Sequence, residues 1–164
     1  MKFHSLSLLV FGLGLVIGGA NASAKDLTSR LGVGIKNNTS FDLPSLAAVY
    51  YPSPDLGLTG GVGIDTQKDE SRFTLNAGLR RILFREDNMN FYFGGQAGLI
   101  NYETVGKKES GFELNALFGG EFFFTGLESL GFSFEGGVGV ASLDNVRFRT
   151  FADHPFRAGI TFYF

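Results

Sequence analysis

The last seven residues of the chain, 158–164, alternate strictly between apolar side chains and small or polar ones. A period of two predicts a β-strand, because successive side chains of a strand point to opposite faces of the sheet. Ile160, Phe162 and Phe164 share one face, and the sequence ends on the phenylalanine. Such an ending is unusual for a soluble domain and favours a strand of a membrane β-barrel.

The N-terminus has the layout of a secretory signal peptide. A positive start at Lys2 is followed by a short apolar run at 6–17 and by small residues at 22–24. The run of about 12 residues is too short for a membrane-spanning helix, which needs about 20. We therefore expect residues 1–24 to be a cleaved signal peptide and residues 25–164 to form one exported domain.

The composition excludes several classes of protein. The chain contains no cysteine, so neither a disulfide scaffold nor a lipid-modified cysteine is expected. Its formal net charge of −2 is too balanced to indicate a nucleic-acid partner. With 24 glycines, 19 phenylalanines and no stretch of helical periodicity, it favours an all-β fold.

Eight segments have the period-two pattern of strands. They lie at 30–36, 46–51, 56–65, 72–80, 91–102, 112–124, 130–141 and 158–164. Short connections at 52–55, 84–90 and 125–129 alternate with mostly longer, polar ones at 37–45, 66–71, 103–111 and 143–155. This alternation is typical of an outer-membrane barrel with its short turns in the periplasm. We predict a closed antiparallel up-and-down transmembrane β-barrel of eight strands.

Two details of this pattern stay open. The segment 46–51 is too uniformly apolar to assign its two faces. After residue 80 the alternation breaks at Arg81, Ile82 and Leu83, where either a β-bulge or an early end of the strand fits.

Alternation alone does not distinguish a membrane barrel from a soluble, lipocalin-like barrel with an apolar interior. The polar face decides between them, because it consists largely of glycine, threonine, serine and asparagine instead of the lysine and glutamate of a wetted surface. The other face is rich in phenylalanine on nearly every strand. We therefore expect the phenylalanines to face lipid and the polar face to line the lumen.

A few charged residues fall on the polar face and are predicted to form a cluster in the barrel interior. They are Arg72, Arg80, Glu113, Glu121, Glu135 and Arg157, with Arg30 and Lys36 on the first predicted strand. Glu135 and Arg157 lie on neighbouring strands and are expected to pair, because an unpaired buried charge costs several kcal/mol. A salt-bridged plug is the favoured interpretation, since the interior of an eight-stranded barrel is just wide enough for side chains to fill. A gated or selective pore is the alternative.

Aromatic residues at the strand ends are predicted to form the interfacial girdles of the barrel. The candidates for the periplasmic rim are Tyr51, Tyr92, Tyr163 and Phe164, and those for the outer rim are Tyr102, Phe112 and Phe156.

Support for catalysis is confined to the last loop. His154 follows Asp153, and Ser142 and Asp144 lie at the start of the same loop, a set of residue types that a lipid-directed hydrolase or acyltransferase would need. A solvated loop histidine is the simpler interpretation. Nothing in the sequence has the spacing of a metal site, and we expect no cofactor.

The pattern of residues 25–164 resembles the small bacterial outer-membrane β-barrel proteins, the group of OmpX-like proteins, opacity-protein-like proteins and OmpA-type membrane domains. Its most specific element is the terminal strand with Ile160, Phe162 and Phe164, which resembles the signal that the barrel-assembly machinery reads. The resemblance implies a location in the outer membrane among lipid and lipopolysaccharide. No peptidoglycan-binding domain follows the barrel segment, so the anchoring role of the OmpA type is not implied.

Three classes of function remain. The favoured one is a structural or interaction role without an open pore, in which the loops or the barrel rim contact a partner protein or lipopolysaccharide. The second is a narrow channel for small solutes, and the third is a lipid-modifying enzyme.

Overall fold

The computed structural model describes residues 25–37, 41, 43–150 and 157–164, and this part of the chain is all-β. Its strands are β1 (Leu31–Asn37), β2 (Pro44–Tyr50), β3 (Leu56–Thr66), β4 (Glu70–Glu86), β5 (Met89–Thr104), β6 (Lys107–Phe123), β7 (Leu130–Ser142), β8 (Val146–Thr150) and β9 (Arg157–Tyr163). Among the described residues, none belongs to a helix that is long and apolar enough to span a membrane.

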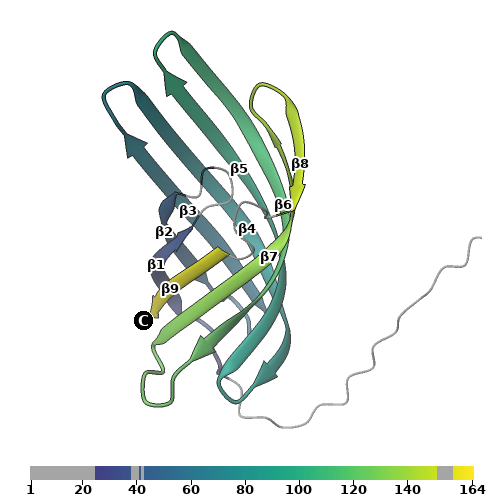
Figure 1. Ribbon diagram of the computed structural model, residues 1–164. Coiled ribbons are helices and arrows are strands. Elements are labelled where there is room, and N and C mark those ends of the chain that lie inside the picture. Colours follow the sequence, from purple (N-terminus) through teal and green to yellow (C-terminus); the bar gives the residue numbers. More distant parts are fainter. Residues whose placement is uncertain (1–24, 38–40, 42, 151–156) are drawn as a thin grey trace, which may run out of the picture.

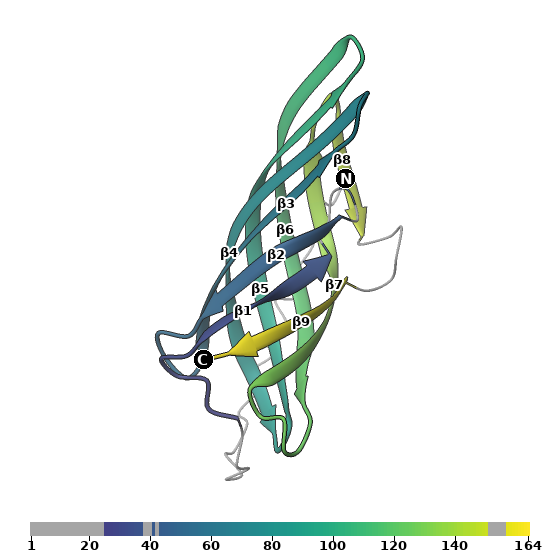
Figure 2. The same ribbon diagram turned by 90° about the vertical axis from the view of Figure 1, so that its left-hand side faces the viewer.

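The strands close into an antiparallel barrel (Figures 1 and 2). Each strand from β1 to β7 pairs with the next along the chain, and β9 closes the ring by pairing with both β7 and β1. The upper half of β7, Val138 to Ser142, pairs with β8, whereas its lower half, Leu130 to Glu135, pairs with β9. β8 and β9 therefore share one position in the wall, and the barrel has the eight positions that the sequence predicts.

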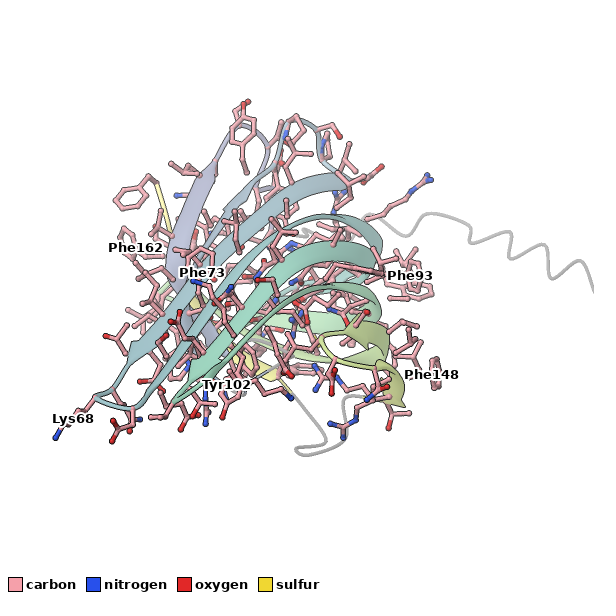
Figure 3. All side chains as sticks on the ribbon, turned by 90° about the horizontal axis from the view of Figure 1, so that it is seen from above. Lys68, Phe73, Phe93, Tyr102, Phe148 and Phe162 are labelled. Atoms are coloured by element: carbon pink, nitrogen blue, oxygen red, sulfur yellow. The ribbon has the colours of Figure 1, made fainter. Side chains whose placement is uncertain are left out.

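Apolar side chains cover the outside of the barrel, and polar or small ones fill the inside. Phe93, Phe134 and Phe162 point outward with exposed fractions of 53%, 40% and 46%, and Figure 3 shows Phe93, Phe148 and Phe162 outside the ring of strands. The facing of β2, which the sequence leaves open, follows the same rule. Leu46 is exposed and Val49 is buried in the lumen.

A β-bulge accounts for the break in alternation after residue 80. Ile82 lies opposite Tyr92, but Phe84 lies opposite Phe91, so that Leu83 is an extra residue in β4. Leu83 and Phe84 both point outward as a result. The strand continues through the bulge to Glu86, which excludes the early end.

The connections that the sequence predicts at 66–71 and 103–111 are shorter hairpins in the structure. Only residues 67–69 separate β3 from β4, and only 105–106 separate β5 from β6. Gly106 has a φ of 78°, which glycine adopts without strain, and this permits the two-residue turn. The expected loop 143–155 also contains a strand, β8, because Val146 and Phe148 alternate with arginines. The backbone of polar residues forms the hydrogen bonds of a β-ladder as well as that of apolar residues does. Polarity alone therefore does not indicate a loop.

The wall of the barrel is uneven in height. β1, β2 and β9 have 7 residues each, whereas β4, β5 and β6 have 17, 16 and 17. The hairpins β3–β4, β5–β6 and β7–β8 rise on the taller side, and β1, β2 and β9 cross at a lower level (Figure 1). The turns that join β2 to β3, β4 to β5 and β6 to β7 form the opposite end.

Candidate functional site

An ion pair crosses the lumen near the end that carries the short turns. The Arg80 guanidinium on β4 donates from Nη2 to Glu121 Oε2 on β6 at 2.8 Å and to Tyr163 Oη on β9 at 2.8 Å. The Tyr163 hydroxyl in turn donates to Glu121 Oε1 at 2.7 Å. Glu121 is 0% exposed and Arg80 5%. These three side chains, the lower tier, join strands from three sides of the barrel.

Two further tyrosine rings enclose the guanidinium of the lower tier. The Arg80 Cζ atom lies 5.0 Å from the centroid of the Tyr51 ring and 4.7 Å from that of Tyr92. A ring face attracts a cation, and the attraction is stronger where both are removed from water. The positive charge of Arg80 is thus compensated by a carboxylate, a hydroxyl and two aromatic faces.

A second cluster, the middle tier, lies on β1, β7 and β9. Glu135 accepts hydrogen bonds from Lys36 Nζ and from the guanidinium of Arg157, whose Nε is 3.1 Å from Glu135 Oε2. Tyr92 Oη also donates to Glu135 Oε1, at 2.7 Å. Glu135 is 1% exposed and is therefore a carboxylate that is almost fully removed from water yet has three donor side chains.

Tyr92 connects the two tiers, since its ring stacks on Arg80 and its hydroxyl binds Glu135. A cavity of about 50 Å³ lies beside the middle tier, lined in part by Asn76, Gln96 and Ser133. This volume has room for a few water molecules. The Nη1 and Nη2 atoms of Arg157 each donate to Gln96 Oε1 at 3.4 Å, and this contact narrows the cavity further. Among the residues that the structure describes, the side chains of the two tiers thus fill the lumen at this level.

The remaining predicted charges lie nearer the outer end. Glu113 on β6 is 1% exposed and lies 4.0 Å from Arg149 on β8. Arg72 lies apart from the other predicted charges: it is half-buried at the outer end of β4, where its Nε donates to Glu70 at 2.7 Å. The structure thus brings Arg80 together with Glu121 and Glu135 together with Arg157, and places Glu113 and Arg72 separately above them.

The prediction that three tyrosines lie on the periplasmic rim is wrong. Tyr51, Tyr92 and Tyr163 are 0%, 1% and 1% exposed and belong to the lumen. The reason is parity, because Tyr92 and Tyr163 fall on the polar face of their strands, next to the outward Phe93 and Phe162. Phe164 is 69% exposed and remains a candidate for the rim. Phe156, predicted for the outer rim, lies outside the described residues.

The predicted assembly residues all lie on the outer surface of the last wall position. Ile160, Phe162 and Phe164 are 50%, 46% and 69% exposed. The Phe162 and Phe164 rings contact edge to face with centroids 5.0 Å apart, and the Phe164 N–H donates to Leu31 O at 2.9 Å. One outward residue of β4, Arg81, is charged and exposed, and it lies low on the wall beside Phe93.

The candidate catalytic pair of the last loop, Asp153 and His154, lies outside the described residues. Within the part of the chain that the structure describes, no group of three or more histidine, cysteine, aspartate or glutamate side chains is arranged to hold a metal ion.

No family model matches this chain, and no curated protein matches it.

Proposed function

We propose that this chain is a small integral protein of a bacterial outer membrane, with a sealed lumen and a structural or interaction role. The observation that carries the proposal is the inverted distribution of polarity. Glu121, Glu135 and Arg157 are buried inside the barrel, whereas Phe93 and Phe162 on its outer surface are exposed. A soluble barrel would have the opposite arrangement.

The extent of the outer apolar surface supports the membrane over water. Monomeric soluble proteins rarely expose contiguous apolar patches larger than a few hundred Å². The outward positions of β3, β5, β6 and β7 are apolar or glycine over residues 56–64, 91–99, 112–122 and 130–140. These runs match the 9–11 residues that a tilted strand needs to cross a bilayer. In β4 the run ends at residue 79, before Arg81. Arg81 lies low on the wall, where a long cationic side chain extends to the headgroup region.

The filled lumen supports a role without an open pore. The lower and middle tiers bridge opposite strands with charged hydrogen bonds, and opening a path through them would separate Glu121 from Arg80 or Glu135 from Arg157. Each separation leaves a buried charge without its partner, at a cost of about 3–5 kcal/mol. A narrow channel for small solutes is therefore disfavoured.

The outer hairpins β3–β4, β5–β6 and β7–β8 are the surface that we assign to interaction. Their upper ends carry charged residues of both signs, including Lys107, Lys108 and Asp144, which form exposed ion pairs. The neighbouring Glu109 and Asp144 raise the pKa of the Lys107 ammonium. Such a surface suits lipopolysaccharide phosphates or a charged partner protein.

Heat-modifiable migration tests the fold in its proposed setting. A closed barrel folded in detergent resists unfolding until it is boiled, so we expect boiled and unboiled samples to migrate differently on a gel. Recovery in the outer-membrane fraction, in a form that urea does not extract, tests the location. Identical migration, or recovery as a soluble protein, would contradict the proposal.

Co-purification from native membranes tests the interaction role. We expect a partner to be lost when the β5–β6 hairpin is shortened by replacing residues 103–108 with Asn-Gly, because Tyr102 and Glu109 are opposite each other and can be joined by that turn. Exchanging Lys107 and Glu103 for each other is the matched control, since it keeps the hairpin and its net charge. A partner that binds all three proteins equally contradicts a role of this hairpin.

A further inference from the structure

The segment before β1 folds back beneath the barrel. Leu27 is 1% exposed and belongs to the buried apolar cluster of the lower lumen, together with Tyr51, Tyr92 and Phe123. A turn returns the chain to the wall, because Arg30 N donates to Leu27 O at 3.0 Å and Ser29 N donates to Tyr51 O at 2.8 Å. We call residues 25–30 the N-terminal plug.

Polar contacts fasten the plug to the neighbouring turn between β6 and β7. Lys25 Nζ lies 2.6 Å from Glu128 Oε2, and this ammonium group lowers the pKa of the Glu128 carboxyl. Arg30 Nη2 donates to Ser129 Oγ at 3.3 Å. Within the plug, the Asp26 carboxylate accepts hydrogen bonds from the backbone and the hydroxyl of Thr28. The plug is therefore a built element with partners at Tyr51, directly after β2, and on the turn between β6 and β7.

One buried group beside the plug has an unused hydrogen-bonding capacity. Asn90 is 0% exposed, and its Nδ2 donates to the backbone carbonyl of Lys25 at 3.5 Å. Its Oδ1 is buried and has no partner among the residues that the structure describes. A buried acceptor without a donor is unfavourable, and native proteins generally supply one.

Processing of the chain would create a donor next to this acceptor. Hydrolysis of the 24–25 peptide bond adds one water molecule and leaves a carboxyl group on Ala24 and a free amine on Lys25. The amine belongs to the same residue as the carbonyl that Asn90 already binds. As an ammonium group it has three N–H donors that rotate freely, whereas the amide of the precursor has one donor in a fixed plane. Hydrogen bonds from a charged donor are also stronger.

We propose that the base of the barrel is a binding site for the chain's own processed N-terminus, in which Asn90 Oδ1 accepts the α-ammonium group of Lys25 and Leu27 closes the periplasmic mouth. This inference rests on the proposed function and on the cleavage after residue 24 that the sequence predicts. The added hydrogen bond would hold the plug more firmly in the processed protein than in its precursor, so that maturation strengthens the seal.

The absence of cysteine from the sequence permits a direct test of the plug. Leu27→Cys and the matched Leu127→Cys, whose leucine is 55% exposed at the same end of the barrel, are each placed in a chain that begins at Lys25. Both proteins are folded in detergent and treated with a water-soluble maleimide. We expect Leu27→Cys to react at least about 10-fold more slowly, because the plug must first open.

The folded state of each variant is checked by heat-modifiable migration before labelling. Equal labelling rates in two heat-modifiable proteins would overturn the plug and leave the proposed function intact. Loss of heat-modifiability in the unsubstituted chain would instead count against the proposed function.

The ammonium group is tested by extending the N-terminus. We expect a chain that keeps residues 22–24 before Lys25 to label Leu27→Cys several-fold faster than the chain that begins at Lys25. Asn90→Leu should raise labelling of the processed chain to the level of the extended one, whereas Asn90→Asp, which retains an acceptor, should preserve protection. An extension without effect on the labelling rate would overturn the assignment of Asn90.

Discussion

Single side chains in the lumen take part in more than one interaction. Tyr92 is the clearest case, since its ring covers the Arg80 guanidinium while its hydroxyl donates to Glu135. The lower and middle tiers are therefore coupled through one residue. Substitutions in the two tiers should not be additive, because they share this partner.

Replacing Glu121 with glutamine should destabilise the barrel by about 3–5 kcal/mol, because Arg80 would remain buried without its counter-charge. Unfolding by urea in detergent, followed by tyrosine fluorescence, measures the effect. Asp55→Asn is the control, since the Asp55–Arg85 pair has an aspartate that is 61% exposed and should cost less than about 1 kcal/mol to remove. Equal losses of stability in the two variants would show that the burial of an ion pair does not determine how much it stabilises this barrel.

The alternation of the sequence places most of these residues correctly and, with the order of the strands, predicts the pair of Glu135 and Arg157. It does not identify Glu121 and Tyr163 as the partners of Arg80. Arg80, Glu121 and Glu135 fall on the polar face and lie in the lumen. Tyr92 and Tyr163 fall on the same face, yet the expectation of an aromatic rim overrode their parity. Their partners come from strands that are remote in sequence, such as β4, β6 and β9, and this pairing depends on how the ring closes and not on any local pattern.

At the scale of single elements, the bulge in β4 shows how the strand tolerates an extra residue. Leu83 and Phe84 both face outward, and the regular alternation resumes beyond them. Deleting Leu83 should therefore leave every other side chain on its present face.

We expect the Leu83 deletion to fold with a loss of stability below about 1 kcal/mol, since it only removes an unpaired position of the ladder. Deleting Leu79 is the matched control, because it removes a regular position and inverts the facing of one end of β4 relative to the other. That variant should not reach the heat-modifiable form. Failure of both deletions would indicate that the bulge itself is required.

A second prediction about a single element concerns the C-terminal end of the last strand. Phe164→Asp should lower the amount of protein in the outer membrane several-fold, because it places a charge on the terminal aromatic residue that we propose as part of the assembly signal. Immunoblots of membrane fractions measure this amount. Phe148→Asp introduces the same charge at another exposed phenylalanine, which is 69% exposed on β8, and should have a smaller effect. Unchanged levels of Phe164→Asp would contradict the assignment.

The sequence predicts the long strands with strong alternation and, to within one residue, the short connections 52–55 and 125–129, but not the lengths of the connections at the other end of the barrel. The segments 72–80, 91–102 and 130–141 lie within strands of the barrel, and 112–124 passes the end of β6 by one residue. β4 and β5 extend beyond the predicted segments in both directions, and β6 extends beyond its segment at the start. The sequence does not predict β8, because the arginines at 147 and 149 are typical of a loop. Charged residues above the apolar band can still form ladder hydrogen bonds, and hydropathy does not detect these.

At the scale of the whole molecule, the lumen is bridged by side chains from most of the wall. β1, β4, β5, β6, β7 and β9 each contribute a residue to the lower or middle tier. Such bridging favours a rigid barrel that does not conduct.

We expect the protein to show no stepwise conductance in a planar lipid bilayer, because the two tiers leave space only for water molecules. The comparison is a variant with serine at both Arg80 and Glu121, which removes the ion pair of the lower tier without leaving a charge unpaired. Channel activity of the unsubstituted protein would overturn the sealed lumen and restore the narrow channel as the leading function.

The uneven height of the wall has a consequence for the surrounding lipid. Seven residues of a tilted strand span about 17 Å, short of the roughly 25 Å apolar band of outer-membrane barrels, whereas the β4–β6 side exceeds it. A bilayer meeting β1, β2 and β9 would have to compress its acyl chains there, at a cost that grows with each ångström of mismatch. As far as the described residues reach, the barrel would thus be lower on one flank, which would favour short-chain lipid there and orient the molecule relative to its neighbours in the membrane plane.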